Sequence, residues 1–470
     1  MIALRPYQQA LADAIRGEYA AGRKAVLAVA PTGAGKTVLF SYVAFNAAQR
    51  GKRVLILAHR RELIRQASSK LNDAGVPHGI IAPGYTPSRD LVQVASVQTM
   101  ARRLADPRYA EPDLIVYDES HHAVAGQWAV VGAAYPEARI LGVTASPERL
   151  DGRGLGIEAG GPFDAMVMGP TVGELMAGGF LTPARVFAPA GGGPDLSGIR
   201  TKGGDFDGAE LASAMDKPAL VGSCVEHYAR LTPGLPAIAF CVSVAHAEHT
   251  AEQFRSAGWR AVAASGATPM AERDAAIGGL ATGAVQVLCA ADLVSEGLDI
   301  PAVSVVILQR PTKSLGLYLQ QVGRGLRPAP GKTHLMILDH AANCLRHGMP
   351  DAPREWTLAG RPKGKKKEAP PASRQCPTCF AVTAPVPVCP ECGHQFVTAA
   401  REIEHVDGTL SEIDADRLTA LRQTKLHVLL KDARTEEDLR EIAKAKQYKR
   451  GWVEHVLASR RQHQGQGRAA

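Results

Sequence analysis

The segment from Ala30 to Thr37, which reads Ala-Pro-Thr-Gly-Ala-Gly-Lys-Thr, constrains this chain more than any other. An apolar run typical of a buried strand precedes it at 25–29, and a helix-like stretch follows it at 38–48. A strand, a glycine-rich turn, Gly-Lys-Thr and a helix form a setting in which backbone N–H groups and a helix N-terminus bind phosphate. There Lys36 can reach the β- and γ-phosphates, and the Thr37 hydroxyl can ligate Mg²⁺. We predict a nucleotide-phosphate loop, although Ala30 stands where the general pattern has glycine.

Composition adds broad limits. The 470 residues allow two or three domains, and an apolar content of 46% is enough to bury their cores. The net charge of +8 is typical of a chain with a polyanionic partner, usually nucleic acid. The sequence has no run of about 18 uncharged apolar residues and no secretion signal, so we expect no membrane span and no disulfides among the eight cysteines.

Strand-like apolar runs alternate with helix-like stretches in two blocks, which is typical of parallel sheets covered by helices. The first block has candidate strands at 25–29, 54–58, 92–95, 114–117 and 140–144. The second block has candidate strands at 237–242, 260–263, 286–289, 303–308 and 335–338. The pattern therefore predicts two α/β domains, with a glycine-rich connector between them at 190–204.

Two carboxylates follow the candidate strand at 114–117. A carboxylate at the end of a parallel strand lies on the edge where ligands bind. Asp118 is placed to hold Mg²⁺, and Glu119 is placed to orient and deprotonate a water molecule. The alternative is a solvated Asp-Glu pair, which the phosphate loop upstream disfavours.

A basic string, Gln320 to Pro328, ends a predicted helix that begins near Ser314. Arg324 and Arg327 are three residues apart, so one helical turn would place both on one face. Two guanidinium groups on one face can act as arginine fingers on a transferring phosphoryl group. A solvent-exposed basic helix is the alternative.

Four cysteines form two C-x2-C pairs, the spacing of a zinc ribbon with four thiolates around Zn²⁺. They are Cys376, Cys379, Cys389 and Cys392. Free thiols in a disordered tail are the alternative, and His394 is interpreted as a bystander. The other cysteines, Cys224, Cys241, Cys289 and Cys344, are predicted to be core residues.

Together these motifs closely resemble those of the superfamily-two helicases and translocases over residues 1–345. Further matching strings are Leu4-Arg5-Pro6-Tyr7-Gln8, Ala58-His59-Arg60-Arg61-Glu62-Leu63, Ser96-Val97-Gln98-Thr99, Gly142-Val143-Thr144-Ala145-Ser146-Pro147 and Ser295-Glu296-Gly297-Leu298-Asp299-Ile300-Pro301. Asp118-Glu119-Ser120-His121 matches a D-E-x-H box, and Gln320–Arg327 fits Q-x-x-G-R-x-x-R.

The resemblance implies an ATP site between two RecA-like domains, with nucleic acid across the opposite edge. The implied catalytic residues are Lys36, Asp118, Glu119, Arg324 and Arg327. The implied ATP and Mg²⁺ contacts are Arg5, Gln8, Thr32, Gly33, Ala34, Gly35, Lys36, Thr37, Asp118, Gly297 and Asp299. The implied nucleic-acid contacts are Arg60, Arg61 and Thr99. The residues implied to couple the ATP site to the nucleic-acid site are His121, Thr144, Ser146 and Gln320.

Within this group the chain is similar to the bacterial and phage helicases that include RadD. The D-E-S-H box and the short Q element argue against the D-E-A-D-box RNA helicases, so we expect DNA rather than RNA as partner. Single-strand-binding or recombination proteins are candidate protein partners, and a bacterial or phage-infected cytoplasm is the expected location. The alternatives are a double-strand translocase, a restriction-type motor subunit and a DNA-binding scaffold.

The predicted fold class is α/β, with two RecA-like parallel-sheet domains in tandem followed by a small zinc ribbon and an α-helical tail. The predicted divisions are 1–189 for the ATP-binding domain, 190–215 for a connector, 216–358 for the second domain, 359–374 for a basic Pro/Lys linker, 375–398 for the ribbon and 399–470 for the tail.

Overall fold

The computed structural model describes eight stretches of the chain, and the positions between them lie outside the description. The described residues are 2–124, 126–149, 152–188, 193–291, 300–360, 373–396, 420–449 and 451–466. The chain divides into two compact units, Met1–Val397 and Thr398–Ala470, and each is described by itself. None of the described helices is long and apolar enough to cross a membrane.

The first domain has a seven-stranded sheet in the order β3-β4-β2-β5-β6-β1-β7, in which every pair is parallel. The strands are β1 (Ala25–Val29), β2 (Val54–Ala58), β3 (His78–Ile81), β4 (Val92–Ser96), β5 (Leu114–Asp118), β6 (Arg139–Thr144) and β7 (Ala165–Met168). The helices are α1 (Pro6–Ala20), α2 (Lys36–Ala48), α3 (Arg61–Asp73), α4 (Val97–Ala101), α5 (Gln127–Ala134) and α6 (Val172–Ala177).

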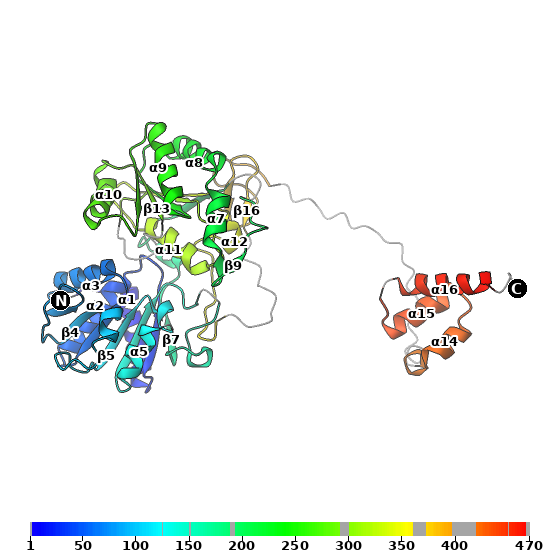
Figure 1. Cartoon of the computed structure of the whole chain (residues 1–470), viewed down its shortest axis with the longest axis horizontal. Coiled ribbons are helices and arrows are strands. Elements are labelled where there is room, and N and C mark those ends of the chain that lie inside the picture. Colours follow the sequence, from blue (N-terminus) through cyan, green and yellow to red (C-terminus); the bar gives the residue numbers. More distant parts are fainter. Residues whose placement is uncertain are drawn as a thin grey trace. The chain divides into compact units, whose positions relative to one another are not determined.

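Alternate side chains of these strands enter two different cores, because successive side chains of a strand point to opposite faces. Val26 and Ile56 join the core that contains residues of α1, α2 and α3. Leu27 and Leu55 join the core that contains residues of α4 and α5. Helices therefore cover both faces of the sheet, as the alternation of apolar runs predicts (Figure 1).

The second domain has an eight-stranded sheet in the order β12-β13-β11-β14-β15-β8-β17-β16. Its strands are β8 (Ala184–Phe187), β11 (Ala237–Cys241), β12 (Ala261–Ser265), β13 (Val287–Ala291), β14 (Val305–Leu308), β15 (Leu335–Asp339), β16 (Arg374–Gln375) and β17 (Ala381–Thr383). Its helices are α8 (Pro218–Leu231), α9 (Val244–Ser256), α10 (Met270–Thr282), α11 (Leu315–Gly325) and α12 (Asn343–His347). Two tandem parallel-sheet α/β domains are thus confirmed, and Cys224, Cys241, Cys289 and Cys344 are buried as predicted.

The predicted first domain ends at residue 189, but strand β8 shows that the second sheet begins before that residue. This strand pairs in parallel with β15, so residues 184–187 belong to the second sheet and not to the first domain. Strands β3, β7 and β8 were not among the candidate strands. Each has only four residues and includes partly exposed positions, so its apolar pattern is too short to stand out.

The predicted connector is folded where the structure describes it. It contains a small hairpin of β9 (Thr201–Lys202) and β10 (Asp205–Phe206), followed by α7 (Gly208–Met215). The Asp205 carboxylate accepts hydrogen bonds from Thr312 Oγ1 at 2.8 Å and from Lys313 N at 2.6 Å. These bonds tie the hairpin to the segment that leads into α11.

The cysteine segment extends the second sheet. Strand β17 pairs antiparallel with β8, and β16 pairs with β17. Gln375 Nε2 donates to Ala188 O at 2.6 Å, and Arg185 lies 3.3 Å from the Glu391 carboxylate. The ribbon therefore covers an edge that β8 would otherwise expose.

The segment that follows α12 returns to the first domain. Trp356 and Leu358 pack against the core on the α4 and α5 face of the first sheet. Gly156 N donates to Leu358 O at 2.9 Å, and Gly154 N donates to Ala359 O at 3.2 Å. The last residues of the predicted second domain, which ends at 358 in the sequence interpretation, thus contact the first domain.

The tail unit is helical where it is described, as predicted. It contains α14 (Leu426–Asp432), α15 (Glu436–Lys446) and α16 (Trp452–Gln466). Leu439 and Ile442 of α15 are buried, with Leu429 and Trp452 among the residues packed around them. The tail is therefore a small helical module with its own apolar core.

Candidate nucleotide site

The order of the first sheet gathers the predicted motifs at one edge. Strands β5, β6 and β1 are neighbours, and the residues that follow them are Glu119, Ala145 and Ala30. In a parallel sheet these carboxyl ends meet at the edge where ligands bind. The phosphate loop, the D-E-S-H box and the motif at Thr144 therefore lie side by side.

The phosphate loop has the backbone that its glycines predict. Gly35 has φ 81° and caps α2, which begins at Lys36. A side chain at Gly35 would be strained at this angle and would meet the Gln8 amide. Lys36 Nζ donates to Ala30 O at 3.3 Å and to Pro31 O at 3.5 Å, so its ammonium lies over the loop.

The five residues predicted to be catalytic influence one another electrostatically. Burial lowers the pKa of Lys36, the Glu119 and Asp118 carboxylates raise it, and Arg324 and Arg327 lower it. Asp118 and Glu119 are only 6% and 8% exposed. Groups from both domains thus surround one ammonium in a partly dehydrated site, where charges interact strongly.

Glu119 has an unusual backbone for a residue other than glycine. Its φ of 54° lies in the left-handed region, which costs of order 1–3 kcal/mol. Its Oε2 is buried and accepts no hydrogen bond among the described residues, and His121 Nδ1 lies 3.5 Å away. The strained backbone thus holds a carboxylate oxygen with spare hydrogen-bonding capacity.

The N-terminal Q element contacts the phosphate loop directly. Gln8 Nε2 donates to Ala34 O at 3.0 Å, and Tyr7 Oη donates to the same oxygen at 3.1 Å. Arg5 N donates to Gln8 Oε1 at 3.0 Å, and the Arg5 guanidinium lies 5.1 Å from the Phe180 ring centre. The structure therefore adds Tyr7 and Phe180 to the surroundings of Arg5 and Gln8, the two implied ATP contacts of this element.

Helix α11 packs closely against the first domain at two glycines. A Cβ at Gly323 would run into the side chain of Thr32, with Cγ2 at 2.8 Å. A Cβ at Gly316 would lie 2.6 Å from Ser146 Oγ. These glycines are seven positions apart, so both lie on one face of the helix. We call this glycine-lined contact the α11 seam.

The two arginines differ in their setting. Arg324 belongs to α11, but the helix ends at Gly325, so the prediction that one helical turn carries both is wrong. Leu326 caps the helix, and Arg327 lies in the segment beyond it. Burial lowers the pKa of Arg327 to about 10, and its Cγ would lie 3.7 Å from a Cβ at Gly33. Arg327 therefore still reaches the phosphate loop.

The predicted coupling residues lie between the site and the seam. Thr144 Oγ1 donates to Ser146 O at 2.9 Å and accepts from Ser146 N at 3.2 Å. Ala30 N donates to Thr144 O at 3.0 Å, which joins this turn to the phosphate loop. Gln320 is buried in α11, and His121 lies beside Glu119.

The predicted nucleic-acid contacts follow β2 and β4, which are neighbours in the other half of the same sheet. Arg60 caps α3, Arg61 begins that helix and is exposed, and Thr99 lies in α4. Gln98 Nε2 donates to His59 O at 3.2 Å and links the two motifs. Gly297 and Asp299 lie outside the described residues, so their predicted nucleotide contacts stay predictions.

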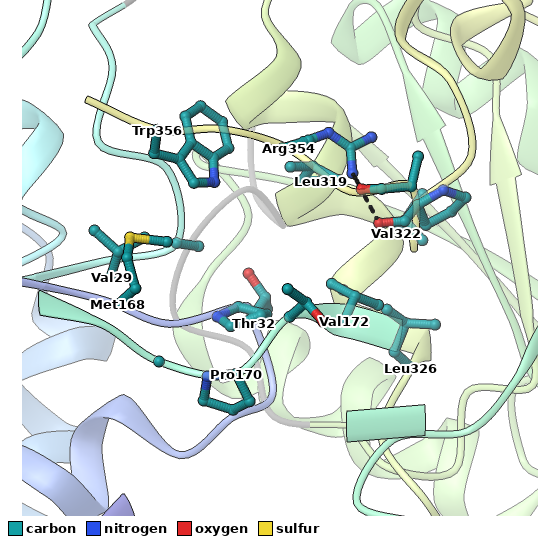
Figure 2. A pocket seen from close by; sticks show the side chains of 17 residues that line it. Val29, Thr32, Met168, Pro170, Val172, Leu319, Val322, Leu326, Arg354 and Trp356 are labelled. Atoms are coloured by element: carbon teal, nitrogen blue, oxygen red, sulfur yellow. Dashed lines mark hydrogen bonds between the residues drawn. The ribbon is translucent and has the colours of Figure 1, made fainter. Parts of the chain in front are cut away.

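An apolar pocket borders the α11 seam (Figure 2). Its lining comes from both domains and includes Val29, Thr32, Met168, Leu319, Val322 and Leu326. Arg354 Nη1 donates to Ala352 O at 2.8 Å and to Pro350 O at 3.1 Å, which folds the segment after α12 over this pocket beside Trp356. The sequence interpretation named Thr32 as an ATP contact but assigned no role to Arg354 or Trp356.

The four cysteines of the ribbon converge. Their Sγ atoms all lie within 4.8 Å of one another, with Cys376–Cys392 at 3.6 Å and Cys379–Cys389 at 3.7 Å. Thiolates at about 2.3 Å from a tetrahedral Zn²⁺ would be separated by about 3.8 Å, so the donor set fits this ion. His394 Nδ1 lies 3.1 Å from Thr378 Oγ1, and the converging group of ligand atoms consists of the four cysteines.

Comparisons with known proteins agree with this architecture. The family described as "Type III restriction enzyme, res subunit" matches residues 1–149, and "Helicase conserved C-terminal domain" matches residues 220–329. A "51.5 kDa protein" of a Lactococcus phage is 34% identical over 369 residues, which cover 78% of this chain and 77% of the relative. The chain belongs to the superfamily-two helicases and is an ATP-hydrolysing enzyme of that class.

Two further comparisons agree with this assignment. IRC3 of Saccharomyces cerevisiae, whose name describes an ATP-dependent helicase, is 31% identical over 356 residues. These cover 72% of this chain, which spans about half the length of the yeast protein (51%). A fragment of an HsdR subunit of a type I restriction enzyme from Vibrio vulnificus superposes with a TM-score of 0.56 at 21% identity, over 72% of this chain and 64% of the other. That last likeness shows a shared fold.

Because the α11 seam leaves no room at position 323, Gly323→Ala is expected to slow ATP hydrolysis about tenfold. The added methyl group must displace Thr32 of the phosphate loop, and overpacking of this kind costs about 1–3 kcal/mol. The measurement is steady-state ATP hydrolysis. Gly222→Ala in α8 is the control, because its Cβ meets no atom within 4 Å. Parental hydrolysis by Gly323→Ala would contradict a close seam.

Proposed function

We propose that the protein is a nucleic-acid-dependent ATPase that moves on, unwinds or remodels DNA. The observation that carries the proposal is the convergence of Lys36, Asp118 and Glu119 from one domain with Arg324 and Arg327 from the other. A site divided in this way is complete only when both domains meet. Hydrolysis can therefore drive a change in the distance between them.

Each residue of the site has a chemical role in this proposal. The loop N–H groups and Lys36 bind the phosphates of ATP, and Glu119 orients and deprotonates the attacking water. Arg324 and Arg327 stabilise the negative charge that develops on the transferring phosphoryl group. Thr37 and Asp118 are placed to hold Mg²⁺, which when bound would neutralise phosphate charge.

The coupling between hydrolysis and movement is proposed to pass through the α11 seam. Ser146 contacts the start of α11 at Gly316, and its turn is bonded through Thr144 to the phosphate loop. Arg60 and Thr99 follow β2 and β4, which are neighbouring strands of the same sheet. A change at the phosphate loop thus has a short, rigid route to the proposed nucleic-acid contacts.

DNA is proposed as the track because of the +8 net charge and the sequence resemblance to DNA-acting helicases. The restriction enzyme LlaBIII, solved bound to DNA, shares the fold with a TM-score of 0.51 at 16% identity over 71% of this chain and 27% of that one. Action in repair, recombination or phage replication, a bacterial or phage-infected cytoplasm, and single-strand-binding or recombination proteins as partners belong to the same proposal.

The ribbon is proposed to bind one Zn²⁺ through its four thiolates and thereby to stabilise the edge of the second sheet. Cys376 and Cys389 are buried in a small cluster with Ala381 and Phe396, which is too small to fold a segment alone. Strand β17 carries this cluster onto β8. Zinc would therefore support the second domain as well as the ribbon.

ATP hydrolysis is expected to rise with DNA. The measurement is steady-state hydrolysis by the protein alone and with single-stranded DNA, duplex DNA, forked DNA or RNA, and a labelled fork reports strand separation. Equal hydrolysis across the panel would refute nucleic-acid dependence.

Lys36→Ala should lower hydrolysis by at least about 100-fold, because it removes the cation at the phosphates, while DNA binding persists. Parental hydrolysis by Lys36→Ala would refute the site.

Replacing Cys376 and Cys379 together by Ser is expected to release zinc and to lower the midpoint of thermal unfolding. Metal analysis of the purified protein and hydrogen exchange of β8 are the two measurements. Cys224→Ala, at a buried position in the second domain outside the ribbon, should retain zinc even if it is less stable. Zinc content unchanged by the double substitution would exclude a four-thiolate site.

A further inference from the structure

Lys332 follows the end of α11 by seven residues and turns back onto it. Its Nζ donates hydrogen bonds to Gly325 O, to Val303 O and, at 2.8 Å, to Arg327 O. The side chain is partly buried, and neither the motifs nor the comparisons assign it a role. One ammonium thus joins three backbone oxygens around the two arginines of the nucleotide site.

The position of these oxygens matters because the last carbonyls of a helix lack partners within the helix. A cation at this end also offsets the negative end of the helix dipole. Gly325 directly follows Arg324, and the third oxygen belongs to Arg327 itself. Lys332 therefore holds the backbone at Gly325, next to Arg324, and at Arg327 itself.

Lys332 contacts the backbone of Arg327 directly, whereas Arg324 lies within α11. Helix α11 ends at Gly325, two residues before Arg327. Thr182 N donates to the intervening Leu326 O at 2.7 Å. Three successive carbonyl groups are thus held from outside the helix, and Lys332 supplies the bonds to two of them.

The arrangement has an electrostatic cost. Burial lowers the pKa of Lys332 to about 8, and the positive charge of Arg327 lowers it as well. A lysine placed beside a second cation in a dehydrated site is unfavourable unless its hydrogen bonds compensate. The hydrogen bonds to the three carbonyl groups provide this compensation, and the ammonium can form them only at the end of α11.

We propose that Lys332 is a positioning residue for ATP hydrolysis, because it fixes the backbone at Arg327 so that the guanidinium meets the phosphate loop. The inference rests on the proposed role of Arg327 on the transferring phosphoryl group. Lys332 itself contacts neither the loop nor ATP in this account. Its effect should therefore fall on the rate of hydrolysis and not on the binding of ATP.

Lys332→Met keeps the aliphatic stem and removes the three bonds. It is expected to lower kcat about 10- to 100-fold, because a small misplacement of a catalytic group has effects of this size. KM for ATP should stay within about threefold, since the residues that bind ATP are unchanged. Lys332→Arg, which retains charge and donors, should recover part of kcat.

Two controls separate positioning from folding. Assays are run below the unfolding temperature of each variant, and Lys52→Met, which removes an exposed ion pair with Asp113, should have parental kcat. In an Arg327→Ala background, Lys332→Met should reduce kcat by a smaller factor than in the parent, because both act through one group.

Several results would overturn the inference. Parental kcat for Lys332→Met, no recovery with Lys332→Arg, or an equal reduction factor in the Arg327→Ala background would each contradict it. Parental hydrolysis by Arg327→Ala itself would instead refute the proposed role of that arginine, and the inference with it. An impaired Arg327→Ala combined with a fully active Lys332→Met would refute the positioning role alone.

Discussion

The contact between helix α11 and the phosphate loop is the constraint on which the rest of the structure depends. At Gly323 the helix comes so close to Thr32 that a methyl group does not fit, and at Gly316 it comes equally close to Ser146. Close-packed interfaces of this kind switch between discrete arrangements and deform little. In the proposed mechanism, the seam converts the state of the phosphate loop into a position of the second domain.

Two further features support this seam from the side of the second domain. The hairpin of the cysteine ribbon covers the outer edge of β8, and Thr182 N, just before β8, donates to Leu326 O at the end of α11. The segment after α12 crosses back and packs Trp356 against the first domain. The ribbon and this segment thus belong structurally to the two α/β domains, although they lie outside the sequence motifs.

Much of this could be predicted from the sequence because the central strands are continuous apolar runs. Residues 25–29 and 54–58 form strands at the predicted positions. The short strands β3, β7 and β8 have too few residues for a clear period, so the assignment of β8 to the second sheet required the structure. The position of Arg327 was missed for another reason, since the sequence carries a stop signal before it: Gly325 ends the helix, and Pro328 follows three residues later.

The candidate site also contains some residues that the sequence predicts and others that only the structure reveals. Lys36, Asp118, Glu119 and Arg324 were predictable because phosphate chemistry demands these residue types after particular strands and helices. Lys332 carries no such signal, because its role depends on which carbonyl groups its ammonium reaches in three dimensions. Residues that position catalytic groups are therefore found in structures more readily than in motifs.

The central claim is that the two domains of one chain build one ATP site. Its most direct test mixes Lys36→Ala protein with Arg327→Ala protein and measures ATP hydrolysis in the presence of DNA. If each chain supplies both halves of its own site, the mixture hydrolyses ATP no faster than the sum of the two variants alone. Hydrolysis clearly above that sum would show that the arginines of one chain complete the site of another, and would contradict the account.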